Sequence, residues 1–202
     1  FDVDEHDTAL TLNTKCFEAG IDGFLSLVQQ IESGSLAPRA QSLSERTYFP
    51  KFRLPEAAAT LQFDATTDQA ERLFRALDYG SGYRNPLAFT KVLIAGKAYN
   101  IGRLTRDDSV AGAVPGQVVE ISDGSAVIAT RDAAVRIADL TDEYGTTVEI
   151  SSVLSRGQNL AAIEPSLATD LTTLSSGLAR CDAYFRRQLR SLQDLDLPSF
   201  DR

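Results

Sequence analysis

Hydrophobic residues recur at helical spacing in the first third of the chain and in short β-rich runs in the middle. The first helical run follows an N-cap at Asp7-Thr8 and extends from Leu10 to Ile31, with its apolar positions on one broad face. Gly20 and Gly23 fall inside this run, and each costs about 1 kcal/mol relative to alanine. The pattern therefore predicts either one helix that kinks at these glycines or two helices that meet closely.

A second helix is predicted after a stretch that has no periodicity. Residues 35–56 contain three prolines and no sustained apolar spacing, which favours an extended segment crossing the molecule. Thr66 and Gln69 then have the spacing of a capping box, and the helix that they begin should end at Leu77.

The middle of the chain predicts an antiparallel β-structure. Five short runs rich in Val and Ile are separated by turn residues, and they cover residues 88–93, 98–104, 117–121, 126–130 and 134–140. Asp123-Gly124 between two of the runs is a strong hairpin signal. Five strands at this spacing predict a small closed or partly open barrel of OB type.

The last stretch returns to helical spacing. Eight apolar residues from Leu167 to Leu192 repeat at intervals of three and four, which is nearly a heptad seam. Pro165 lies where this helix can begin, and Pro198 follows its end. The apolar stripe needs a surface to cover it: either the rest of this chain or, as we favour, the next domain of a larger protein.

The segment between the second helix and the strands is a candidate ligand edge. It joins two architectures and is dense in polar and aromatic side chains, although it could also be only an ordered connector. The candidate binding residues are Arg75, Asp78, Tyr79, Arg84 and Asn85. The i,i+4 spacing also predicts that Glu71 pairs with Arg75 on the exposed side of the helix.

Charge and composition exclude several classes of function. The 202 residues carry a net charge of −8, and residues 86–150 hold six Lys or Arg against nine Asp or Glu, which disfavours a nucleic-acid partner. No apolar run is long enough to span a bilayer, so we expect a cytoplasmic protein with no membrane partner. Cys16 and Cys181 lie on apolar helix faces and are expected to be buried thiols, and no metal site is expected. The chain lacks Met and opens on Phe1, so we expect a piece of a longer polypeptide.

An ordered set of motifs resembles the methionyl-tRNA formyltransferase family. The set comprises Asp7-Thr8-Ala9, Lys15 and Gly20, then Gly34 and Gln41, then Thr47-Tyr48-Phe49-Pro50-Lys51, Phe63-Asp64, Arg75-Ala76-Leu77, Pro115-Gly116 and Val127-Ile128-Ala129-Thr130. The variant Asp78-Tyr79-Gly80 followed by Asn85-Pro86-Leu87 is more similar to the formyltransferase-like domains of nonribosomal peptide synthetases, and the final helix is similar to linkers that lead into the next synthetase domain.

The resemblance implies an α+β fold in three parts. Residues 1–82 would be the helical end of an α/β formyltransferase catalytic domain, residues 83–150 an OB-like antiparallel β-barrel, and residues 151–202 a long helical linker. It implies transfer of a formyl group from formyltetrahydrofolate to the amine of a carrier-bound amino acid, with a carrier protein and adjacent synthetase domains as partners.

The same resemblance implies that the catalytic groups lie outside this chain. The family uses an Asn, a His and an Asp, and none of the three matches a position here, so the fragment alone is expected to be inactive. His6 lies beside the first helix cap rather than in the family motif, and we expect it to be solvated. The alternative function is a non-catalytic module that positions neighbouring synthetase domains or a carrier protein.

Overall fold

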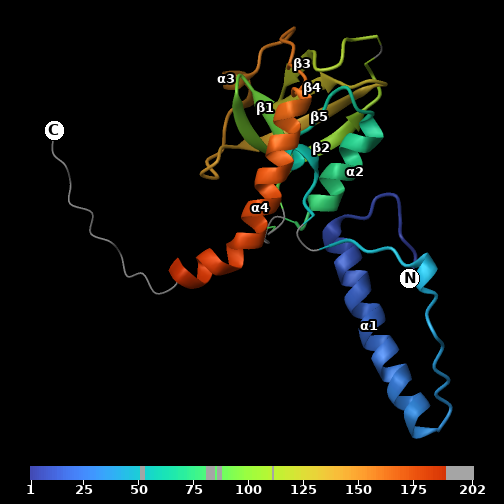
Figure 1. Cartoon of the computed structure of the whole chain (residues 1–202). Helices are drawn as coiled ribbons and strands as arrows, with labels where there is room; N and C mark the ends of the chain where they lie inside the picture. Colours follow the sequence, from blue (N-terminus) through green and yellow to red (C-terminus); the bar gives the residue numbers. More distant parts are fainter. Residues whose placement is uncertain (51–52, 81–84, 86–87, 111, 190–202) are drawn as a thin grey trace.

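The computed structural model describes residues 1–50, 53–80, 85, 88–110 and 112–189. Its helices are α1 (Ala9–Glu32), α2 (Thr67–Leu77), α3 (Ile150–Val153) and α4 (Pro165–Leu189), with short 3-10 turns η1 (Leu43–Glu45) and η2 (Glu56–Ala59). Its strands are β1 (Lys91–Ile94), β2 (Lys97–Asp107), β3 (Val118–Ser122), β4 (Ser125–Ala129) and β5 (Ala134–Thr141). All five predicted strands are present, and the fold combines helices with an antiparallel sheet (Figure 1).

The strands form one antiparallel sheet in the order β1-β2-β5-β4-β3. The predicted hairpin joins β3 to β4, and its turn residues Asp123 and Gly124 have φ values of 49° and 69°. Both values lie in the left-handed region that a two-residue hairpin requires, which explains the Asp-Gly pair.

The sheet is not closed into the expected barrel, because β1 and β3 remain its two edges. Each edge is instead covered by another part of the chain. Leu61 N donates to Lys91 O at 2.8 Å on one edge, and Val118 N donates to Gln158 O at 2.8 Å on the other. Covering the edges satisfies their free backbone groups without the strand tilt that closure demands.

The core lies between the sheet, α2 and the segments before and after them. It includes Leu61, Phe63 and Ala70 from one side of the predicted boundary at residue 82, together with Val92, Ile101, Ile128, Ile137, Leu140, Ile150 and Leu154. Helix α2 contributes Ala70 and Leu77 as buried residues, with Leu73 and Phe74 packed against the core. The core thus draws on residues on both sides of positions 82 and 150, and the three-part division of the longer polypeptide stays a prediction.

Helix α2 begins as predicted. Thr66 accepts from Gln69 N at 3.3 Å, and Gln69 Oε1 accepts from Thr66 N at 3.0 Å, which completes the capping box. The next residue, Thr67, is buried and shares a 2.6 Å hydrogen bond with the hydroxyl of Thr130 at the end of β4. This pair fixes the start of the helix to the sheet.

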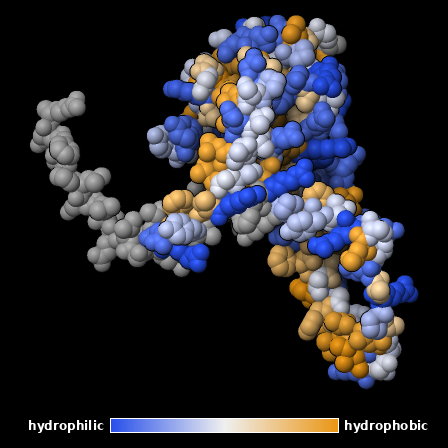
Figure 2. All heavy atoms as spheres, viewed as in Figure 1, coloured by the Kyte–Doolittle hydropathy of each residue, from blue (hydrophilic) through white to orange (hydrophobic). Residues whose placement is uncertain are grey.

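Helix α1 is one continuous helix that extends away from the sheet, and none of its residues is buried (Figure 1). Large apolar side chains are exposed along it, including Phe17, Phe24 and Ile31, and Figure 2 shows hydrophobic residues gathered in this region. The expectation that Cys16 and Cys181 are buried is therefore wrong, since both thiols are exposed. The apolar faces that carry them exist, but no described part of the chain covers those faces at these positions.

Helix α4 packs against η2 and then runs on beyond the sheet (Figure 1). In η2 three consecutive alanines, Ala57, Ala58 and Ala59, have φ values of 48°, 53° and 65°. This left-handed turn is held from two directions. Ala57 N donates to Thr172 Oγ1 of α4 at 2.9 Å, and Lys91 Nζ of β1 donates to Ala58 O at 2.8 Å.

Candidate functional site

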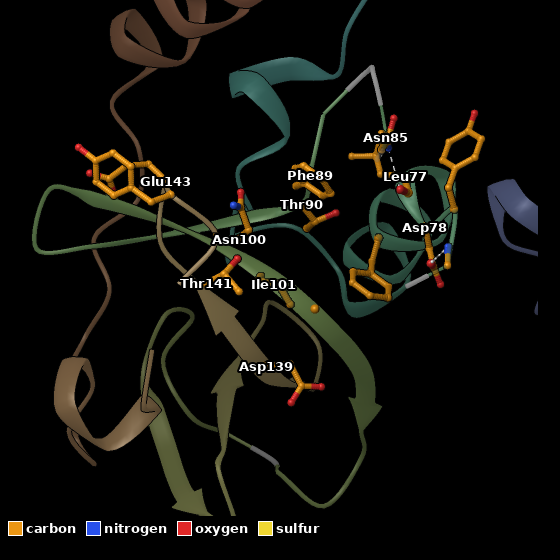
Figure 3. Close-up of a pocket in the computed structure, with 16 residues that line it drawn as sticks. Leu77, Asp78, Asn85, Phe89, Thr90, Asn100, Ile101, Asp139, Thr141 and Glu143 are labelled. Atoms are coloured by element: carbon orange, nitrogen blue, oxygen red, sulfur yellow. Dashed lines mark hydrogen bonds between the residues drawn. The ribbon is translucent and has the colours of Figure 1, made fainter. Parts of the chain in front are cut away.

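A pocket of about 800 Å³ opens between the end of α2 and one end of the sheet (Figure 3). We call it the α2–β2 pocket. Its described lining consists of Phe74, residues 77–80, Asn85, Phe89, Thr90, residues 100–102, Asp139, Thr141 and residues 143–145. The pocket is therefore assembled from the predicted ligand edge together with β2, β5 and the turn that follows β5.

The α2 side of the pocket is fixed by backbone caps. Asn85 is buried, and its Nδ2 donates to Leu77 O at 2.7 Å, which satisfies a carbonyl at the end of the helix. Asp78 follows as the C-cap, and its Oδ1 accepts from Gly80 N at 2.8 Å. The main-chain oxygen of Asp78 accepts from Leu10 N at 3.0 Å, so this rim of the pocket also contacts the start of α1.

The structure brings together three of the five predicted binding residues. Asp78, Tyr79 and Asn85 line the pocket, whereas Arg75 is not among its lining residues. Arg84 lies outside the described residues. The predicted pair between Glu71 and Arg75 is not found among the described residues, and Nε of Arg75 is buried there without a hydrogen-bond partner. The i,i+4 ion pair of α2 joins Arg72 to Asp68 at 3.0 Å instead.

The sheet side of the pocket depends on a close approach between β2 and β5. A Cβ atom at Gly102 would lie 2.8 Å from the main-chain oxygen of Asp139, so only glycine fits there. Asp139 itself has a φ of 56°, which is uncommon within a strand. Its carboxylate is exposed on the pocket rim and lies 3.3 Å from Nε of Arg103.

A tight turn after β5 forms the remaining wall. Asp142 Oδ1 accepts from Tyr144 N at 3.0 Å and from Thr146 N at 2.8 Å, which holds the turn in shape. Glu143 and Tyr144 are exposed at its tip. This wall and the β2 residues of the pocket were not predicted from the sequence. Their neighbours depend on the register between paired strands, and no local sequence pattern indicates that register.

Thr90 lies in the pocket wall between Phe89 and the strands (Figure 3). It is 2% exposed, and its hydroxyl has no hydrogen-bond partner in the described chain. The next residue, Lys91, does not line the pocket. Its Nζ donates to Ala58 O and to Phe89 O at 2.9 Å, and burial lowers its pKa.

The described lining of the pocket is anionic. Asp78, Asp139 and Glu143 contribute carboxylates, and none of the described lining residues is Lys, Arg or His. Phe74, Tyr79, Phe89 and Tyr144 add aromatic surface. An arrangement of this kind attracts organic cations and repels phosphates and carboxylates. Within the described residues, no group of three or more His, Cys, Asp or Glu side chains is placed to hold a metal ion.

The acidic residues before α1 form a separate cluster that is structural. Lys15 Nζ lies 2.8 Å from Asp4 Oδ2 and 2.7 Å from Asp7 Oδ2, and the hydrogen bond from Lys15 lowers the pKa of Asp7 to about 2. His6 is exposed beside this cluster, as expected, with its ring nitrogen 3.4 Å from Glu5. No helix in the described part of the chain is both long and apolar enough to cross a membrane.

A sequence model of the formyl transferase C-terminal domain matches residues 53–158. These residues span the sheet, the whole described lining of the α2–β2 pocket and the core cluster except Leu160. The chain belongs to this family.

Solved structures with a similar fold include HypX from Aquifex aeolicus. A multiply substituted variant of HypX is 19% identical over 73% of this chain and 25% of the HypX chain, with a TM-score of 0.53. A doubly substituted variant is 20% identical over 77% of this chain and 26% of its own, with a TM-score of 0.54. The chain thus spans about a quarter of the HypX chains that it matches, and at these identities the likeness shows the fold alone.

Proposed function

We propose that this chain is the C-terminal portion of a formyltransferase within a nonribosomal peptide synthetase. The whole protein would transfer a formyl group from formyltetrahydrofolate to the amine of an amino acid bound to a carrier protein, in the cytoplasm. The observation that carries the proposal is the family match over residues 53–158. The synthetase context is supported by the motif variant at residues 78–80 and 85–87 and by the helical segment that follows the matched region.

The described part of the chain does not hold the groups that the resemblance assigns to catalysis. The chain has one histidine, His6, and it is exposed rather than placed in a site. The α2–β2 pocket also does not suit the folate donor, because the glutamate tail of a folate is anionic and would meet the carboxylates of Asp78, Asp139 and Glu143. We therefore place the donor and the transfer step in the part of the longer protein that precedes this chain.

The position of the pocket supports a role next to that catalytic part. Its rim contacts the start of α1 through the bond between Leu10 N and Asp78 O, and a Cβ atom at Gly80 would lie 3.0 Å from Leu10. Under the proposal, α1 is the last helix of the catalytic domain. Its exposed apolar residues would then pack against that domain, which explains why this chain leaves them uncovered.

The test is an activity assay on the longer protein. We expect the chain extended by its upstream sequence to formylate an aminoacyl carrier protein when formyltetrahydrofolate is supplied, with the product detected by mass spectrometry. The chain alone should give no product. A protein that includes the upstream catalytic residues and still gives no formylated amine would contradict the proposal.

A second candidate function is a non-catalytic scaffold. The exposed apolar residues of α4, which include Leu174, Leu178 and Phe185, favour a helix that seats against a neighbouring synthetase domain. Absence of turnover, combined with binding of a carrier protein or an adjacent domain to the longer protein, would favour this reading.

A further inference from the structure

The carboxylates of the α2–β2 pocket point to a particular class of ligand. Arg103 pairs with Asp139, but neither Asp78 nor Glu143 forms an ion pair among the described residues. Figure 3 shows these two residues on opposite sides of Phe89 and Thr90. Along the described lining, a cationic group that enters the pocket therefore meets a carboxylate without an ion-pair partner on either side.

The position of Asp78 is unfavourable for the fold itself. It is the C-cap of α2, where the helix dipole is negative and a carboxylate is destabilising. One of its oxygens accepts from Gly80 N, a bond that the side-chain oxygen of asparagine could also make. The negative charge is therefore not needed for the turn, and the second oxygen remains available to a ligand.

The wall between the carboxylates is apolar and aromatic, with one unused polar group. Phe89 is half exposed toward the pocket, and the hydroxyl of Thr90 is buried without a partner. A buried hydroxyl with no hydrogen bond lowers the stability of a fold, so its presence in a pocket wall is consistent with a ligand that uses it.

We propose that the α2–β2 pocket binds a primary ammonium group whose neighbouring carboxyl group is blocked, as in an amino-acid ester, amide or thioester. A free amino acid is a poor ligand, because its own carboxylate would face the carboxylates of the pocket. The inference rests on the proposed function in naming this molecule as the formyl acceptor. Carboxylates favour the charged form of an amine, so the pocket holds the acceptor before transfer, and the reaction takes place elsewhere.

Binding to the 202-residue chain tests the proposal directly. The probes are leucine methyl ester, free leucine and N-acetyl-leucine methyl ester, titrated calorimetrically in an amine-free buffer. The first carries the ammonium group alone, the second adds a carboxylate, and the third lacks the positive charge. We expect the methyl ester to bind at least about tenfold more tightly than the other two, which corresponds to about 1.4 kcal/mol. Equal affinities, or no binding of the methyl ester, would overturn the proposal.

Variants separate a binding role from a structural one. Asp78→Asn should weaken methyl-ester binding about fivefold, since a charge-assisted hydrogen bond is roughly twice as strong as a neutral one, and should leave Tm unchanged or raised. Thr90→Val keeps the shape of the side chain and should weaken binding without lowering Tm. Asp170→Asn, on the exposed surface of α4, is the matched control and should leave the affinity unchanged. An Asp78→Asn protein that binds like the parent contradicts the assignment.

The two proposals can fail separately. If the chain binds the methyl ester and the longer protein makes no formylated product, the ligand site stands and the formyl transfer does not. If the longer protein formylates its substrate while the chain discriminates among none of the three probes, the formyl transfer stands and the ligand site does not.

Discussion

Replacing Ala58 with glycine should make this protein more stable. Ala58 has a φ of 53° and a ψ of 36°, and an L-residue with a side chain pays about 1–2 kcal/mol in this left-handed conformation. Glycine removes that cost, but it loses more conformational entropy on folding than alanine does. This loss lowers the gain in stability by about 0.5–1 kcal/mol. Because Ala58 is only half-buried, its methyl group contributes little packing. The expected net gain is about 0.5–1 kcal/mol, or roughly 1–4 °C in Tm.

The flanking alanines provide the matched controls. Ala57 and Ala59 have the same kind of φ, but they are 2% and 0% exposed. Removing either methyl group loses about 0.8 kcal/mol of burial, so glycine at these positions should change the stability little or lower it. The free energy of unfolding of all three variants is measured by urea denaturation followed by far-UV circular dichroism. The comparison requires that the m-value is the same in each variant. A loss of about 1 kcal/mol or more in Ala58→Gly, which is roughly a fivefold fall in the ratio of folded to unfolded protein, would refute the argument from backbone strain.

Three further predictions follow from named contacts. Thr172→Val deprives the buried Ala57 N–H of its acceptor and should cost about 1–3 kcal/mol in urea denaturation, whereas Thr169→Val, one turn earlier on α4, should be close to neutral. Gly116→Ala should lower Tm strongly, because the new Cβ would lie 2.4 Å from the main-chain oxygen of Leu160, while alanine at the open Gly20 should not. The hydrogen bond from Thr67 N lowers the pKa of Asp132 below its usual 3.8, so the stability that it supplies is complete above about pH 4 and is lost as the pH falls further. In thermal melts between pH 6 and pH 2.5, Asp132→Asn should show a shallower acid loss than the parent, and an unchanged slope would contradict this.

The elements that could be predicted from the sequence are those specified by local chemistry. The capping box of Thr66 and Gln69 needs only four consecutive residues to form, and the Asp123-Gly124 turn needs only two. Gly116, part of the family motif Pro115-Gly116, has a local reason too, since its φ of 87° lies in the left-handed region that glycine adopts readily. Such features depend on backbone geometry that these residue types themselves determine.

Burial of the helix faces could not be predicted in the same way. An apolar stripe indicates that some surface should cover it, but not whether that surface belongs to the same chain. Phe17 and Phe24 on α1 and Leu178 on α4 are all exposed, and the error over Cys16 and Cys181 has this single cause.

Only part of the pocket lining could be predicted from the sequence. Asp78 and Asn85 could be selected because they follow a helix end, where unsatisfied carbonyls need partners and loops carry polar side chains. Glu143 reaches the same pocket only because β2 pairs with β5 in one register, and a shift of one residue would turn the neighbouring side chains to the other face. The close contact between Gly102 and Asp139 fits this register, since a side chain at Gly102 would push the two strands apart. The anionic character of the pocket is therefore a property of strand pairing, and it follows that substitutions at Gly102 should change ligand binding even though glycine offers a ligand no side chain.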